Sequence, residues 1–256
     1  MQKRDLYLVV TAYLLVIASA ELLTTYLTKA GIALHAVILF TLLVHAAFEA
    51  DRNKHLSHFL MALVLAPLIR ILSLSMPATI FSRISWFLIV SIPLFIATVT
   101  CVWLQALRPE DIGLSLSHRK DLPIEASVLI LAVPFGLLEY YILKPAPLPL
   151  GSGIANFIVA SLILVLCTGF LEELAFRGVI QTNATRLMSK WSGILIVSTI
   201  FGVLHIGNLA LLDCLLAFAI GFIWSVVREK TGSIYGISIS HGVINIILFL
   251  LAPGYF

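Results

Sequence analysis

Nine apolar stretches, each about 17 to 28 residues long, follow one another along this sequence of 256 residues. A run of roughly 18 apolar residues is long enough to cross a bilayer as a helix. Lipid offers no partner for backbone N–H and C=O groups, so helices are the expected element. We predict an all-α, polytopic transmembrane helix bundle of about nine spans, with eight as the alternative. The predicted spans are 6–28, 31–48, 56–76, 84–107, 124–143, 154–181, 191–207, 208–228 and 232–252.

The composition excludes several other classes of protein. Hydrophobic residues make up 61% of the chain, charged residues 11%, and the mean hydropathy is +1.08. A water-soluble domain is closer to half apolar, so soluble enzymes, disulfide-stapled secreted domains and disordered chains do not fit. The net charge of +3 is too small to indicate a polyanionic partner such as nucleic acid. The expected surroundings are the lipid bilayer.

The distribution of Lys and Arg predicts the orientation of the spans. Eleven of these residues lie in the N-terminal tip and the even-numbered loops, and three lie in the odd-numbered loops. Cytoplasmic loops carry the excess of positive charge. We therefore expect the N-terminus in the cytoplasm and the C-terminus outside.

Ionisable residues inside a span are expensive and each needs an explanation. Six of them stand alone in the sequence. We interpret each of the six as satisfied by an interhelical hydrogen bond or placed near a membrane interface. They are Glu21, His35, His45, Arg70, Glu139 and Asp213.

A pair of glutamates begins the most informative segment. Glu173 and Arg177 are four residues apart and share one helix face. Glu172 is rotated by about 100° from Glu173 and has no local cation. We therefore expect Arg177 to neutralise the Glu173 carboxylate, while the Glu172 carboxylate points in another direction.

Two further motifs lie on later spans. Phe201-Gly-Val-Leu-His205 is followed by His241-Gly-Val-Ile-Asn245, whose end residues share a helix face. Positions 172 and 205 are equally far from the charged turn near residues 186–190, so an antiparallel hairpin places Glu172 and His205 at matching depth. We expect Glu172, His205, His241 and Asn245 to converge within the bilayer.

A glutamate, two histidines and an asparagine suit hydrolysis by an activated water. A carboxylate or imidazole can act as general base on water, and an imidazole and a carboxamide can donate to a developing oxyanion. No Gly-x-Ser-x-Gly elbow and no His-Glu-x-x-His motif occur in the sequence.

The order Glu-Glu-x-x-x-Arg, Phe-x-x-x-His, His-x-x-x-Asn resembles the CPBP intramembrane proteases, a family of glutamic-type enzymes that includes the type II CAAX prenyl endopeptidases. The resemblance covers roughly residues 154–250. We divide the chain into N-terminal helices, 1–123, without a recognised signature, and a protease core, 124–256. The family also indicates a multi-pass protein of the prokaryotic inner or plasma membrane.

The resemblance implies a role for each motif residue. Glu172 would be the catalytic carboxylate, His205 its partner, and His241 with Asn245 the oxyanion site. No cofactor is favoured, although a divalent metal such as zinc is the alternative, with Glu172, His205 and His241 as ligands. Structural support would come from Glu173, Arg177 and Phe201.

The partner expected from the resemblance is a membrane-anchored protein or peptide, cut near its C-terminus. Residues 139–148 look like family members that act in C-terminal sorting, so both prenyl-CAAX-type and sorting-type processing stay open. Two other hypotheses are a proton-coupled membrane transporter and a non-catalytic bacteriocin-immunity or scaffold protein.

Overall fold

The computed structural model describes residues 2–76, 81–150 and 153–255. Nine helices within these ranges are long and apolar enough to cross a membrane, and no strand occurs there. The predicted all-α bundle is therefore confirmed. The helices are α1 (Lys3–Tyr26), α2 (Thr28–Glu49), α3 (Lys54–Leu63), α4 (Leu65–Ser75), α5 (Arg83–Leu104), α6 (Leu122–Leu143), α7 (Ile154–Ile163), α8 (Leu171–Glu173), α9 (Gln181–Leu187), α10 (Lys190–Val203), α11 (Leu211–Thr231), α12 (Tyr235–Ile246) and α13 (Ala252–Tyr255).

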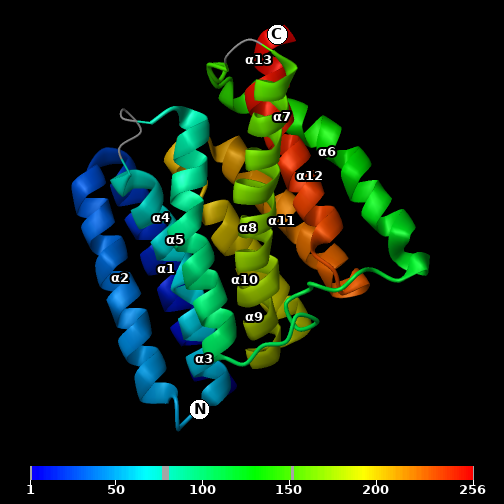
Figure 1. Ribbon diagram of the computed structural model, residues 1–256. Coiled ribbons are helices and arrows are strands. Elements are labelled where there is room, and N and C mark those ends of the chain that lie inside the picture. The colour runs from blue at the N-terminus through cyan, green and yellow to red at the C-terminus, as the bar shows by residue number, and fades with distance from the viewer. Residues whose placement is uncertain (1, 77–80, 151–152, 256) are drawn as a thin grey trace.

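Several spans consist of more than one element. Helices α3 and α4 form one span that is interrupted at Val64, because Pro67 has no N–H to donate to the carbonyl of Leu63. The sixth span, Ile154–Leu187, contains α7, α8 and α9 and extends beyond the predicted end at 181. The two chain ends lie at opposite ends of the bundle, as nine spans require (Figure 1). The cytoplasmic location of the N-terminus stays a prediction.

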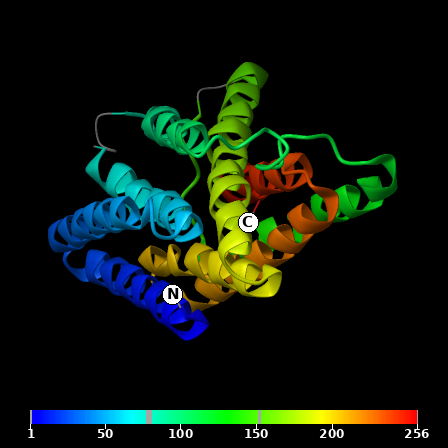
Figure 2. The same cartoon turned by 90° about the horizontal axis from the view of Figure 1, so that it is seen from below.

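The sixth span lies at the centre of the molecule. Figure 2 shows it, in green to yellow, between the blue N-terminal helices and the orange to red C-terminal ones. It contacts α12 almost backbone to backbone: a Cβ added at Gly169 would lie 2.8 Å from the backbone nitrogen of Gly242. Small residues allow such close helix approach within a membrane. This contact brings the segment with the two glutamates beside the helix that carries His241.

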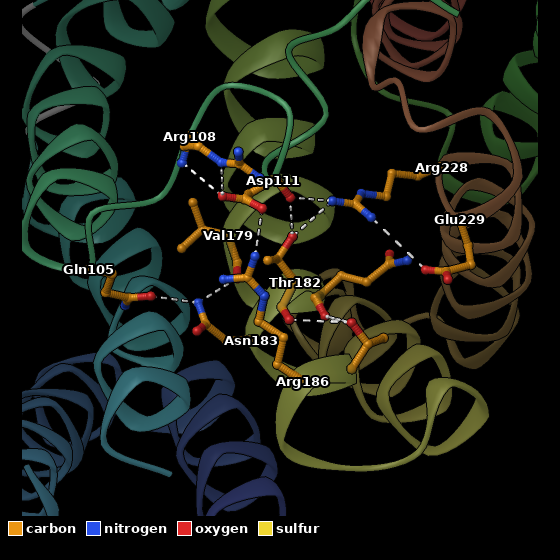
Figure 3. A network of polar contacts seen from close by, with 11 residues as sticks. Gln105, Arg108, Asp111, Val179, Thr182, Asn183, Arg186, Arg228 and Glu229 are labelled. Carbon is orange, nitrogen blue, oxygen red and sulfur yellow. Dashed lines mark hydrogen bonds and ion pairs between the residues drawn. The ribbon is translucent and has the colours of Figure 1, made fainter. Parts of the chain in front are cut away.

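A polar network closes one end of the bundle (Figure 3). It is centred on Asp111, in the loop between α5 and α6. The Asp111 carboxylate accepts from Arg186 at 2.7 Å, and its backbone carbonyl accepts from Thr182 at 2.7 Å and from Arg228 at 2.5 Å. The loop thus links α9 to α11, close to the turn that joins α9 to α10.

Because of this network, the free energy of unfolding depends on pH in the acidic range. The backbone N–H of Arg108 donates to the carboxylate at 2.9 Å and, with the nearby Arg186 cation, holds the pKa of Asp111 below its ordinary value of 3.8. A carboxyl group whose pKa is lowered by folding stabilises the fold at pH values above its ordinary pKa. This contribution is lost as the pH falls through the folded-state pKa. We expect Asp111→Asn to cost about 1 kcal/mol near neutral pH.

The measurement is unfolding in mixed micelles at several pH values. The difference in the free energy of unfolding between wild type and Asp111→Asn should shrink as the pH falls below the ordinary pKa of an aspartate. Glu110→Gln, at the neighbouring position, is the control. A difference that does not change with pH would contradict this account of the Asp111 carboxylate.

Candidate active site

The two glutamates lie between two segments of π-helix. Residues Leu164–Phe170 and Leu174–Ile180 are π-helical and flank α8 on both sides. Such wider turns are rare and often occur at functional sites. The side chain of Glu173 is fully buried, whereas that of Glu172 is 31% exposed. The two neighbouring carboxylates therefore have different surroundings, as the sequence predicts.

Glu173 forms the predicted buried ion pair with Arg177. The Nη1 atom of Arg177 lies 2.8 Å from Oε1 of Glu173, and both side chains have no exposed surface. Aromatic rings surround the guanidinium, whose carbon lies 4.3 Å from the ring centre of Phe201 and 5.3 Å from that of Trp224. Cation–π contacts of this kind compensate for lost hydration. Phe201 thus supports the pair from the first position of the Phe-x-x-x-His motif.

His241 contacts both glutamates. Its Nδ1 lies 3.0 Å from Oε1 of Glu173, and its Nε2 lies 3.9 Å from Oε2 of Glu172. Because a carboxylate that is ion-paired to Arg177 only accepts, Nδ1 carries a hydrogen and Nε2 faces Glu172. The bond to Glu173 was not anticipated from the sequence, which gave Glu173 only one partner.

A hydrogen bond to the last turn of α10 orients His205. Its Nδ1 lies 2.9 Å from the carbonyl oxygen of Phe201. A carbonyl can only accept, so Nδ1 donates, and Nε2 is the ring atom left with a lone pair in the neutral imidazole. This is the arrangement that a general base requires.

Asn245 is oriented through Thr168 on the sixth span. The hydroxyl of Thr168 donates to the carbonyl of Leu164, so its oxygen accepts from Nδ2 of Asn245, at 2.8 Å. The second N–H of the same amide stays available.

All four predicted residues line one cavity of about 530 Å³. The structure therefore places Glu172, His205, His241 and Asn245 around one cavity, within a bundle of apolar spans. His241 and Asn245 are at most 9% exposed. Other residues that the sequence did not assign to the site also line this cavity, among them Arg70, Glu139, Asp213 and Trp224.

Three of the six isolated ionisable residues have the interhelical hydrogen bonds that the sequence analysis expected. Arg70 donates to Glu21 at 2.9 Å, and Tyr13 on α1 bonds to His45 on α2 at 2.9 Å. The ring of His35 lies 3.4 Å from Glu21 without a hydrogen bond, and Asp213 has a local partner, Asn208, at 2.7 Å. Their separate positions in the sequence gave no sign that Arg70 and Asp213 reach the cavity.

The histidines and carboxylates do not form a metal-binding group. In the described part of the chain no three His, Cys, Asp or Glu side chains gather closely enough to hold an ion. Because the alternative ligand set Glu172, His205 and His241 does not fit zinc in this arrangement, we derive no step through a metal.

The apolar spans define a multi-pass membrane protein whose helices line a cavity with polar side chains. Residues 154–247 match a family model whose description is type II CAAX prenyl endopeptidase Rce1-like. The match contains every residue of the three motifs and confirms the resemblance to the CPBP family over this segment. No curated protein and no solved structure matches the chain.

Proposed function

We propose that this protein is an intramembrane endopeptidase that hydrolyses a peptide bond near the C-terminus of a membrane-anchored substrate. The observation that carries the proposal is that Glu172, His205, His241 and Asn245 line one cavity. The family match supports the same class of reaction.

Glu172 is the proposed base because its carboxylate lines the cavity without an arginine partner. It takes a proton from a cavity water, and the hydroxide adds to the scissile carbonyl carbon. Nε2 of His205 is a second acceptor for a hydrogen of this water. When the C–N bond breaks, the leaving nitrogen takes the proton back from Glu172, so that the carboxylate is regenerated.

The oxyanion is stabilised from α12. Asn245 offers the N–H that Thr168 does not use, and His241 offers Nε2–H when its ring is protonated. A protonated His241 balances the charges of Glu172, Glu173 and Arg177. Glu173 then acts only on the orientation of the imidazole, through the 3.0 Å bond to Nδ1.

A comparison of protein C-termini tests the proposal and identifies the substrate. Cells that contain the wild-type protein should show shortened C-termini that are missing with Glu172→Gln. Prenylated substrates that lose a short tail would support CAAX-type processing, whereas the loss of a whole hydrophobic anchor would support sorting-type processing. Identical C-termini in both cell types, together with a proton flux through the reconstituted wild type, would favour a transporter instead.

Thr168→Val should lower the turnover number about 10- to 100-fold while the protein stays folded. The substitution removes the acceptor that orients the Asn245 carboxamide. Thr199→Val is the matched control, since the Thr199 hydroxyl makes the same bond to a carbonyl one turn back but touches no motif residue. Cleavage rates of the two purified variants measure the difference. Equal rates would show that Thr168 has no part in orienting Asn245.

A further inference from the structure

His205 lies just after the end of a helix, in the connection between two spans. Helix α10 ends at Val203 and α11 begins at Leu211, and residues 204–210 between them form a connecting turn that contains a short 3₁₀-helix, Ile206–Asn208. Leu209 in this stretch has a positive φ of 53°. The end of a helix leaves carbonyl groups without intrahelical donors, and these groups need other hydrogen-bond partners.

Arg70 supplies one of these partners from the other half of the chain. Its Nη2 donates to the carbonyl of Leu204, the residue directly before His205. Gly207 lies against the same guanidinium: a Cβ added there would be 3.6 Å from both Nη atoms. The guanidinium thus contacts the turn at two points, on either side of His205.

Arg70 is itself held rigidly. Its Nε donates to Oε1 of Glu21 on α1 at 2.9 Å, and its Nη2 lies 2.8 Å from Oε2 of the same carboxylate, whose side chain has no exposed surface. The charge-assisted hydrogen bond and the second ion-pair contact together restrict the guanidinium. A buried ion pair adds little to stability compared with apolar residues of similar size, so packing alone does not explain why this pair is present.

We propose that Arg70, fixed by Glu21, is a positioning residue for His205. It holds the turn 204–210 and so sets where the imidazole stands on the cavity wall. Residues 1–123, which lie outside the family match, then take part in building the site. The kinetic consequence rests on the proposed protease function, whereas the consequence for the turn does not.

The test uses the neutral pair Glu21→Gln/Arg70→Gln, because Arg70→Gln alone leaves a buried carboxylate unpaired. Hydrogen exchange of the full-length protein in detergent should become about 10- to 100-fold faster in residues 204–210, the factor that corresponds to a lost hydrogen bond to a charged group. Exchange in α12 should not change. Arg83→Gln, an exposed arginine at the start of α5, is the control.

The second measurement is cleavage of the identified substrate. The double variant should lower kcat about 10- to 100-fold with KM unchanged, and Arg70→Lys should recover part of the rate. Unchanged exchange in 204–210 would overturn the proposal, and so would a raised KM with kcat intact, which would indicate substrate binding. If the wild type cleaves nothing, the proposed function fails, while the exchange result still decides whether Arg70 holds the turn.

Discussion

Glu172→Gln is expected to lower the turnover number by about 10²- to 10⁴-fold, the usual contribution of a general base. The amide has the same size as the carboxylate but cannot take a proton from water at neutral pH. Because Glu172 is partly exposed on the cavity wall and makes no buried ion pair with an arginine, the substitution should leave the fold intact. Cleavage of a membrane-anchored substrate by purified protein measures the effect.

Glu125→Gln provides the matched control for this experiment. Glu125 is a buried carboxylate on α6 that accepts from Ser117 at 2.6 Å, and it does not line the cavity. Its variant should cleave at a rate close to the wild type. If Glu172→Gln were equally active, the assignment of the base would be wrong.

Arg177→Met is expected to lower the free energy of unfolding by about 3–5 kcal/mol, because it leaves the Glu173 carboxylate buried beside aromatic rings without its cation. Unfolding in mixed micelles gives the value. Arg186→Met is the control, since that arginine pairs with Asp111 on a surface where its side chain is 40% exposed. A pair of this kind contributes at most about 1 kcal/mol.

A double substitution separates stability from activity at this pair. Glu173→Leu/Arg177→Met replaces both charges by apolar side chains of similar size, which should restore most of the lost stability. Cleavage should nevertheless be lost, because Nδ1 of His241 then has no carboxylate to orient the ring. A stable and fully active double variant would contradict the role of Glu173 given above.

The spans could be predicted closely because one physical requirement dominates them. Each apolar helix must be long enough to cross the lipid and satisfy its own backbone. The predicted boundary between residues 207 and 208 is a real interruption, because the backbone between α10 and α11 is not α-helical there. The extension of the sixth span to Leu187 was missed, since polar residues near its end are satisfied by the loop around Asp111.

The site could be predicted only in part. The spacing of Glu173 and Arg177 predicts their pairing because it depends on a single helix face. The Glu173–His241 bond depends on where two helices touch, at Gly169 and Gly242, which local spacing does not determine. The contact between Arg70 and Leu204 spans 134 positions of sequence; Arg70 lies in no motif, and Leu204 occupies an unspecified position of the Phe-x-x-x-His motif.

The central claim is that residues of the late helices form one hydrolytic cavity within the membrane. Its most direct test is a cleavage assay with purified protein in liposomes that also contain the substrate found by comparing C-termini. The wild type should release one defined C-terminal fragment, and Glu172→Gln should release none at the same protein density. Equal release by both proteins, or no release by the wild type, would contradict the claim.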